Sequence, residues 1–321
     1  MEELVDFLFD VSLARGAIRL ATPVVLAGLG TMLTSRAGIL NIAVEGMILL
    51  GAFVALAGSY FSGSALVGVL LAMLLSMLLA YIFALFSLKW KAHIIIMGVA
   101  INIFAGFLTI YLLRSIFGVA GAFSDPSIQG IPVISLPVIR DIPVLGPLLS
   151  DFSLLVYVSW GVVILTHIFL YRTRWGIHLR AVGEAPDAAK TMGINVERFR
   201  YLAVVSSGAL GGLAGAYLSL GHLILFTEGM SAGRGFIGLA ASIFGMGTPL
   251  GTFAASMIFG LFDSIAWRLQ GLQVLPVQFI QMLPYIATIA ILIAIAVRTN
   301  ISRARLARHS RASLKAAAEV Q

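Results

Sequence analysis

The sequence predicts an all-α membrane protein whose chain crosses the bilayer about eight or nine times, counting short broken helices. Hydrophobic residues make up 60% of its 321 residues and charged residues 11%, and the mean hydropathy is +1.03. These values lie far from those of average soluble proteins. Apolar runs of about 20 residues, the length that crosses a hydrocarbon core, recur along the chain. We therefore expect a multi-pass protein of the cell membrane.

The basic residues predict the orientation of these spans. Most of the 21 Lys and Arg residues fall in two polar segments, 172–200 and 298–315. Because Lys and Arg next to spans mark the cytosolic side, both segments are expected in the cytosol, with the amino terminus outside and the carboxyl terminus inside. The same distribution accounts for the net charge of +7, so no nucleic-acid partner is expected.

The beginning of the chain predicts one regular span and one broken span. Residues 1–16 are expected to form an amphipathic segment on the outer face, before a transmembrane domain over 17–298. The first span covers 17–34. The second, 37–61, is interrupted by polar residues and glycine, which is typical of a broken membrane helix.

Three polar residues are candidates for lining a translocation path: Asn41, Glu45 and Asn102. Glu45 follows Arg36 by nine residues, which places it about 13 Å into the membrane, and Asn102 lies at a similar depth on the fourth span. A carboxylate at that depth costs about 2.5 kcal/mol or more unless it is paired, hydrated or protonated. Asn41 is expected on the same helical face as Glu45. The alternative is structural: such side chains also satisfy backbone groups freed by a helix break.

The third and fourth spans, 64–88 and 93–113, are followed by an outer loop over 114–150. This loop holds five of the ten prolines, at 126, 132, 137, 143 and 147. Proline at that density excludes a regular spanning helix. We expect an ordered loop that either caps the path or receives another protein.

The fifth and sixth spans, 151–171 and 199–222, flank the polar segment 172–200. Within that segment a short helix is predicted over Pro186–Met192, since Pro suits the first helical turn and Gly193 suits a left-handed end. Asn195 is expected to cap the helix that follows. The segment would then be a rigid projection on the cytosolic surface, or simply a connector that is helical.

Glycine recurs on and between the helices predicted in the rest of the chain. Glycines on the sixth span form two overlapping GxxxG spacings, which favour close helix packing inside the bundle, with dimerisation as the weaker alternative. After an outer segment, 223–235, a short helix over 236–246 and a helix over 252–269 resemble the broken second span in their glycine content. Asp263 lies on the second of these helices. A last span over 275–297 precedes a basic cytosolic tail, 299–321.

Several kinds of chemistry are excluded. The chain has no cysteine and no G-x-x-x-x-G-K-[ST] loop, so it has no thiol chemistry and cannot cradle ATP in the usual way. The five histidines are scattered without paired carboxylates, so no metal site and no catalytic residue is expected. A transport role without a cofactor in this chain is the best remaining class.

Three stretches carry a resemblance to a known family: SRAGILNIAVEGMILLGAF from Ser35, RAVGEAPDAAKTMGI from Arg180 and GFIGLAASIFGMGTPLGT from Gly235. They resemble permease subunits of ABC importers for branched-chain amino acids, simple sugars and nucleosides. The resemblance implies a cytosolic coupling loop that docks in a separate ATPase, which binds the ATP. The implied coupling residues are Gly183, Glu184, Pro186, Asp187, Ala188, Ala189, Met192 and Gly193.

The resemblance also implies partners and a substrate class. The partners would be the cytosolic ATPase, a second permease subunit or a copy of this chain, and an extracytoplasmic substrate-binding lipoprotein. The form NIAVEG, beginning at Asn41, is most similar to nucleoside permeases, with simple sugars such as ribose as the alternative substrate. Two other hypotheses remain: an ion-coupled secondary transporter that uses Glu45, and a structural or assembly protein of the membrane.

Overall fold

Long helices joined by short turns make up the chain. The computed structural model describes residues 11–135, 148–271, 282 and 286. The helices are α2 (Val11–Arg36), α3 (Val44–Ser62), α4 (Ala65–Ala84), α5 (Ile94–Phe117), α8 (Leu154–Arg172), α9 (Arg174–Glu184), α10 (Pro186–Thr191), α11 (Val196–Ala216), α12 (Arg234–Phe244) and α13 (Pro249–Gly271). Two π-helical segments continue α4 and α11, η1 (Leu85–Lys89) and η2 (Tyr217–His222).

Seven helices in the described residues are long and apolar enough to cross a membrane, and α12 is a shorter apolar helix. The predicted all-α membrane fold is therefore confirmed. Three predictions fall wholly or mostly outside the described residues. They are the last span 275–297, the tail 299–321 and the first ten residues of the amphipathic segment 1–16. The exact number of spans and the orientation of the termini stay predictions.

Helix α2 is longer than the predicted first span. It begins at Val11, so Val11–Gly16 belong to the same helix as the span and are not separate from it. Pro23 lies inside α2 without ending it. The helix is buried on all sides from Leu20 to Thr34, and such packing holds a proline-containing membrane helix together.

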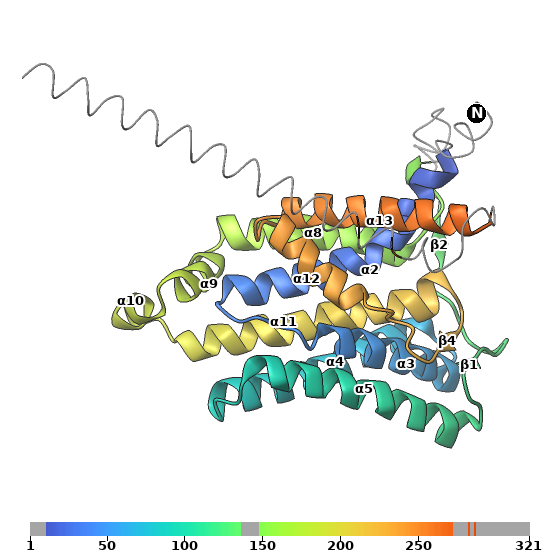
Figure 1. Ribbon diagram of the computed structural model, residues 1–321, viewed down its shortest axis with the longest axis horizontal. Helices are drawn as coiled ribbons and strands as arrows, with labels where there is room; N and C mark the ends of the chain where they lie inside the picture. Colours follow the sequence, from blue (N-terminus) through green and yellow to red (C-terminus); the bar gives the residue numbers. More distant parts are fainter. Residues whose placement is uncertain (1–10, 136–147, 272–281, 283–285, 287–321) are drawn as a thin grey trace, which may run out of the picture. The chain divides into compact units, whose positions relative to one another are not determined.

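Helix α11 lies at the centre of the bundle, packed against α2, α3 and α4 (Figure 1). Gly208 and Gly212 face the backbone of α4, where a Cβ at Gly212 would lie 2.5 Å from the carbonyl oxygen of Ala72. Gly211 and Gly215 face α3 instead. Each of the two GxxxG spacings therefore serves one neighbouring helix, as the prediction of close packing inside the bundle requires.

Two short strand pairs join the loops at the end of the bundle opposite α10 (Figure 1). The strands β1 (Ala122–Phe123) and β4 (Phe226–Thr227) pair antiparallel, as do β2 (Val133–Ile134) and β3 (Phe152–Ser153). Nearby, Arg114 Nη2 lies 3.9 Å from Glu228 Oε1. The predicted outer segments 114–150 and 223–235 thus meet at one end, although residues 136–147 lie outside the described part.

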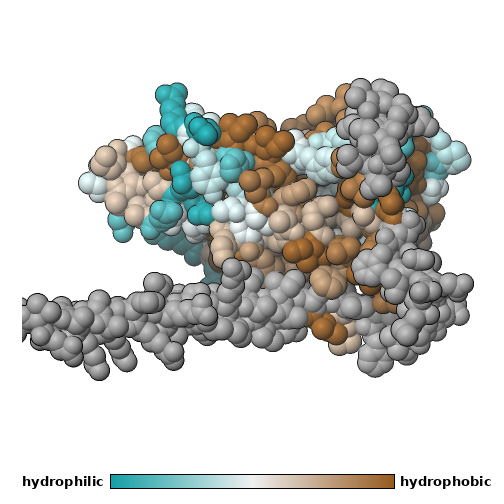
Figure 2. Space-filling model, turned by 90° about the horizontal axis from the view of Figure 1, so that it is seen from above, coloured by the Kyte–Doolittle hydropathy of each residue, from teal (hydrophilic) through white to brown (hydrophobic). Residues whose placement is uncertain are grey.

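Hydrophilic side chains gather at the opposite end, which carries α9 and α10, while hydrophobic ones cover the middle of the helices (Figure 2). By internal contacts the chain divides into two compact units, Met1–Ser264 and Ile265–Gln321. All the residues discussed below lie in the first unit.

Candidate functional site

The second span is broken before α3, over residues 37–43, because polar side chains fix this stretch in a non-helical form. Gly38 begins it with a left-handed φ of +76°. The Asn41 side chain is completely buried; its Oδ1 accepts a hydrogen bond from Ala43 N at 3.0 Å, and its Nδ2 donates to Ser207 Oγ of α11 at 3.0 Å. Asn41 precedes the helix, so the expectation that it shares a helical face with Glu45 was wrong.

Asn102 of α5 holds the other side of this break. Its Oδ1 accepts a hydrogen bond from Gly46 N at 2.8 Å, and its Nδ2 donates to Ile42 O at 3.0 Å. Both halves of the amide therefore bind backbone groups that have no partner within α3. Gly46 fits this contact because a Cβ there would lie 3.0 Å from the same Oδ1.

Glu45 binds the start of the short helix α12. Its Oε1 accepts a hydrogen bond from Gly233 N at 2.8 Å, and its Oε2 accepts one from Gly235 N at 2.7 Å. A carboxylate at a helix N-terminus satisfies free N–H groups and interacts favourably with the helix dipole. The two broken segments of the chain thus meet at Glu45.

The other end of α12 is fixed by Arg36. Its Nε donates to Gly247 O at 2.6 Å and its Nη2 to Met246 O at 3.1 Å. Because α12 has 11 residues, its two ends lie about 16 Å apart. This is about half the thickness of a hydrocarbon core of about 30 Å, so the Glu45 contact lies near its middle if Arg36 lies at one face. The estimate of about 13 Å from the spacing of Arg36 and Glu45 assumed a continuous helix, which the break over 37–43 interrupts.

The projection at the opposite end contains two helices, of which only the second was predicted. Helix α10 has Pro186 at its first position and ends at Thr191, one residue before the predicted end, with Met192 as its C-cap, while Gly193 adopts a left-handed φ of +81°. Asn195 Oδ1 accepts a hydrogen bond from Arg198 N and so caps α11, as predicted. Ala189 of α10 is buried, whereas Asp187 and Ala188 of α10 and the flanking residues Glu184, Met192 and Gly193 are exposed. The exposed group forms the outer face of the projection.

Helix α9 was missed by the sequence reasoning. Its start is capped by Thr173, whose Oγ1 accepts a hydrogen bond from Gly176 N at 3.2 Å. Gly176, Leu179 and Val182 are buried at a helical spacing of three residues. That periodicity and the capping threonine are the signals that could have predicted it.

Helix α9 connects the projection to the break in the second span. Gly183 packs so closely on this break that a Cβ there would collide with the backbone oxygen of Arg36 and lie 3.1 Å from Gly38 N. From α11, Arg200 Nε donates to Ala37 O at 3.4 Å. Helices α9 and α11 thus both contact the end of α2 and the break that follows it.

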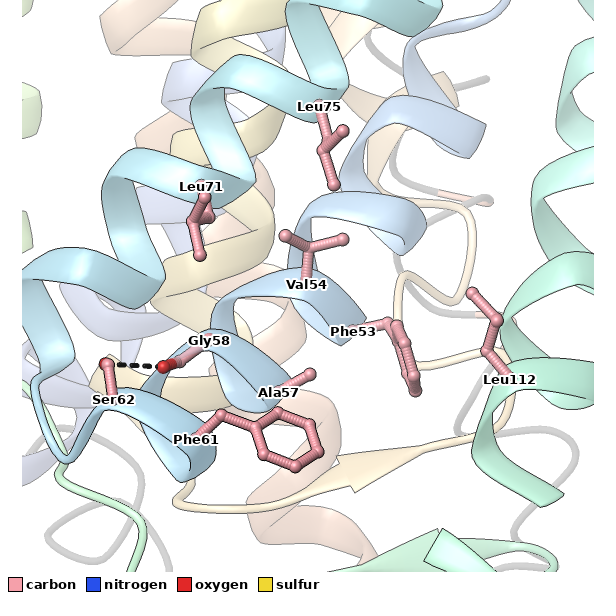
Figure 3. A pocket seen from close by; sticks show the side chains of 9 residues that line it. All are labelled: Phe53, Val54, Ala57, Gly58, Phe61, Ser62, Leu71, Leu75 and Leu112. Atoms are coloured by element: carbon pink, nitrogen blue, oxygen red, sulfur yellow. Dashed lines mark hydrogen bonds between the residues drawn. The ribbon is translucent and has the colours of Figure 1, made fainter. Parts of the chain in front are cut away.

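Two cavities in the described part are mainly apolar, whereas a third, of about 520 Å³ beside α9, is lined by Arg174, His178, Asn195 and Arg198 as well as by apolar side chains. One of about 410 Å³ opens between α3, α4 and α5 (Figure 3). Apart from Ser62 its lining is apolar or glycine: Phe53, Val54, Ala57, Gly58, Phe61, Leu71, Leu75 and Leu112. A second, of about 510 Å³, lies among α8, α11 and their neighbours and is also mainly apolar. Among the described residues, no group of three or more His, Asp or Glu side chains is arranged to hold a metal ion.

Comparison with known proteins identifies the family. The family model described as branched-chain amino acid transport system / permease component matches residues 13–299. A nucleoside ABC transporter permease protein of Lactococcus lactis is 34% identical over 85% of this chain and 88% of its own length. A guanosine ABC transporter permease protein of Bacillus subtilis is 34% identical over 84% of this chain and 87% of its own length.

A third relative and a solved structure extend the comparison. A protein of Haloferax volcanii, named as a candidate glucose ABC transporter permease protein, is 32% identical over 91% of this chain and 94% of its own length. In fold, the chain resembles a metal-chelate type ABC transporter in an inward-facing conformation, with a TM-score of 0.52 and 17% identity over 92% of this chain and 89% of that one. Because the family model covers most of the sequence, this chain belongs to the family of branched-chain amino acid transport system permease components and is an integral membrane subunit of a transport system.

Proposed function

We propose that this chain is the membrane-spanning permease subunit of an ATP-driven importer for nucleosides, with purine nucleosides as the favoured substrates. The observation that carries the importer assignment is the rigid projection formed by α9 and α10, which is linked through Gly183 to the break before α3. The nucleoside assignment is supported by the names of the Lactococcus and Bacillus relatives and by the NIAVEG stretch.

The chain requires partners for this function. It carries no phosphate-cradling loop of its own, so a separate cytosolic ATPase would bind the ATP. A second permease subunit, homologous or identical, would complete the path, and an extracytoplasmic lipoprotein would deliver the substrate. The family assignment supports the ATPase and a substrate-binding partner.

In this proposal the exposed face of α10 docks on the ATPase in the cytosol. Closure of the ATPase displaces α10. Helix α9 transmits the displacement because the backbone of Gly183 packs directly against the backbone of Arg36. Arg36 is bound to the turn after α12, and Glu45 is bound to the start of α12. The displacement would thereby move α3 and α12 together and open the path on one side of the membrane.

In this mechanism Asn41, Glu45 and Asn102 hold the break together. Asn41 and Asn102 use both their amide oxygen and amide nitrogen in hydrogen bonds, and both carboxylate oxygens of Glu45 accept backbone N–H groups. We infer that they position the broken segments beside the path and do not contact the substrate. This also disfavours the ion-coupled alternative, in which Glu45 must exchange a proton or an ion during each cycle.

Reconstitution into liposomes tests the proposed function. The chain, its co-purifying ATPase and the binding protein are assembled, and uptake of labelled guanosine is measured with ATP or with a proton gradient, with ribose as competitor. We expect uptake that requires ATP and the ATPase and that resists ribose. Uptake by the chain alone under a gradient would contradict the importer assignment. Competition by ribose would favour the sugar alternative, which the Haloferax relative supports.

The coupling role of α10 is tested by substitutions on its exposed face. Ala188→Glu and Met192→Asp place a charge where no contact within the chain is lost, since both residues are exposed. We expect the ATPase to dissociate on purification and ATP-driven uptake to be lost. Lys89→Glu, a larger charge change at the end of η1, is the control. This variant should keep both the bound ATPase and ATP-driven uptake. Full uptake in the α10 variants would show that α10 is only a connector.

A further inference from the structure

The cavity of about 520 Å³ beside α9 differs from the two apolar cavities in its basic lining. Arg174 and His178 line it from α9, and Arg198 lines it from the first turn of α11. Asn195 adds an amide group, and no acidic side chain belongs to the lining. The cavity therefore offers positive charge and hydrogen-bond donors to a ligand.

The two guanidinium groups of this cavity have no acidic partner in the described part of the chain. The one ion pair within 4.0 Å there joins Arg114 to Glu228. Glu197 precedes Arg198 in the sequence, but its carboxylate lies more than 4.0 Å from every described basic side chain. Asn195 Oδ1 already caps α11, so the start of that helix needs no further acceptor. The positive charge of the cavity is thus left for a ligand to neutralise.

Aromatic rings form an apolar wall of the same cavity. The rings of Trp175 and Phe199 have their centroids 5.7 Å apart, and the ring of His178 meets that of Phe199 edge-on at 5.6 Å. Phe199 is buried, whereas Trp175 is 40% exposed. Trp is enriched at the interface between membrane and water, because its ring is apolar and its N–H is polar. A ligand with a charged end and an apolar part fits this lining.

The cavity lies at the ends of membrane spans. Helix α8 ends at Arg172, two residues before Arg174, and α11, which begins at Val196, is itself long and apolar enough to cross a membrane. Arg200, in the next turn of α11, donates to Ala37 O just beyond the end of α2. The ends of three spans thus lie near the cavity, at the level of the phospholipid phosphates. In the predicted orientation this is the cytosolic face, whose leaflet carries the anionic lipids.

We propose that this cavity binds the phosphate of an anionic phospholipid, with Arg174 and Arg198 as the charged contacts. Guanidinium groups bind phosphate oxygens through charge-assisted hydrogen bonds, and basic pockets between spans on the cytosolic side bind anionic head groups. His178 supplies a further donor, and the aromatic wall lies against the glycerol and the start of the acyl chains. Because the arginines belong to α9 and α11, a bound lipid joins the two helices that carry α10. The coupling role of α10 rests on the proposed function, whereas the lipid site does not.

Lipid retention tests the proposal on the full chain. The chain is assembled in nanodiscs of equal parts phosphatidylcholine and phosphatidylglycerol, released, and weighed with its bound lipid by native mass spectrometry. We expect a single phosphatidylglycerol to be retained, preferred over phosphatidylcholine at least about tenfold because two arginines act on the same phosphate. The paired change Arg174→Gln and Arg198→Gln should abolish this preference. Retention of the preference in this arginine pair would overturn the proposal.

A second pair of substitutions is the matched control. Lys89→Gln with Arg172→Gln removes the same charge from two exposed side chains that do not line the cavity. This control pair should keep the preference for phosphatidylglycerol. An equal loss in both pairs would show that the basic surface attracts anionic lipid without a site, and the proposal would be wrong.

Thermal unfolding in nanodiscs tests whether the lipid joins α9 to α11. Phosphatidylglycerol should raise the melting temperature of the wild type and of the control pair, because a ligand that binds only the folded state stabilises it. It should leave the melting temperature of the arginine pair unchanged. In pure phosphatidylcholine all three proteins should unfold at the same temperature, which would show that the arginine pair is folded. An equal rise in the arginine pair would contradict the proposed site.

Two other ligands would give different outcomes. Inorganic phosphate, added to nanodiscs of pure phosphatidylcholine, should not raise the melting temperature; a rise equal to that with phosphatidylglycerol would mean that the site takes a soluble phosphate and not a lipid. If the arginine pair loses the ATPase in pure phosphatidylcholine, the cavity receives a group of the ATPase, and the lipid proposal is wrong. Lipid retention and melting use no nucleoside, so a failure of nucleoside uptake would leave this test valid.

Discussion

At the residue scale, the polar side chains near the middle of the membrane show how a broken helix is held in place. Asn102 bridges an N–H and a C=O on the two sides of the break, and Glu45 binds the first N–H groups of a different helix. Lipid offers no hydrogen bonds, so a break requires such side chains nearby. The sequence predicts that Glu45 and Asn102 lie at this depth, but it cannot identify their partners, because Gly233 and Gly235 are far away in the chain.

Glu45→Gln should destabilise the protein whatever the pH. The amide can accept only one of the two N–H groups of Gly233 and Gly235 through its oxygen, and the other N–H loses its partner. Leaving one buried donor unsatisfied costs about 1–3 kcal/mol. In thermal unfolding in nanodiscs, Glu45→Gln should have a lower melting temperature than Glu228→Gln. The second variant is the control, because it makes the same exchange at a partly exposed site. A selective loss of pH-dependent uptake at unchanged stability would support the ion-coupled alternative.

Asn102→Leu should destabilise the protein more than Asn102→Asp. The leucine removes both hydrogen bonds to the break, and its expected loss is about 2 kcal/mol or more, from two unpaired backbone groups. An ionised carboxylate is costly at this depth, so the aspartate is expected to be protonated, with one oxygen accepting from Gly46 N and its O–H donating to Ile42 O. The order of the two melting temperatures at acidic pH is the decisive measurement, and an equal loss for both variants would show that these two hydrogen bonds do not hold the break.

At the element scale, local signals and long-range contacts were predicted with different success. The bounds of α10 followed from Pro186 and Gly193, because caps act within a few residues of the chain. The position of the break before α3 did not follow, since it depends on Asn102 and Ser207 from other helices. Helix α9 was overlooked because its apolar face is short and lies among charged residues.

The contact between α9 and the break predicts the effect of Gly183→Ala. The added Cβ would collide with the backbone oxygen of Arg36, which can move only with the helix that carries it. Such overpacking costs about 1–3 kcal/mol. ATP hydrolysis by the assembled importer should continue while uptake falls, because α9 can no longer pack against the backbone of Arg36 and Gly38. Gly161→Ala in α8 is the matched control, since no atom lies within 4 Å of an added Cβ there. Equal uptake by the two variants would argue against transmission through α9.

At the scale of the whole molecule, the predicted orientation can be tested without disturbing the bundle. Ser127, near β1, and Glu197, at the start of α11, are both exposed and lie near opposite ends of the chain's spans. In intact cells, an impermeant thiol reagent should label Ser127→Cys, and it should label Glu197→Cys only after the membrane is opened. The reverse pattern would show that the termini are oriented opposite to the prediction.

The described spans could be located from the sequence because hydropathy is a property of single segments. How the spans pack was not predictable beyond the glycines of α11, since close approach depends on two surfaces at once. Ser264 illustrates the limit: the sequence places it on the helix over 252–269, and only the fold brings the carbonyl of Leu13 within 3.0 Å of its hydroxyl.

The glycine faces of α11 have a consequence for biosynthesis. Helices α3 and α4 leave the ribosome roughly ten seconds before α11, at ordinary rates of translation. Until then the surface that will receive Gly208 and Gly215 has no occupant from its own chain. The nascent protein therefore has an open groove along the packed pair of α3 and α4, which lipid tails or the insertion machinery must fill, and the arrival of α11 is the step that closes this part of the bundle.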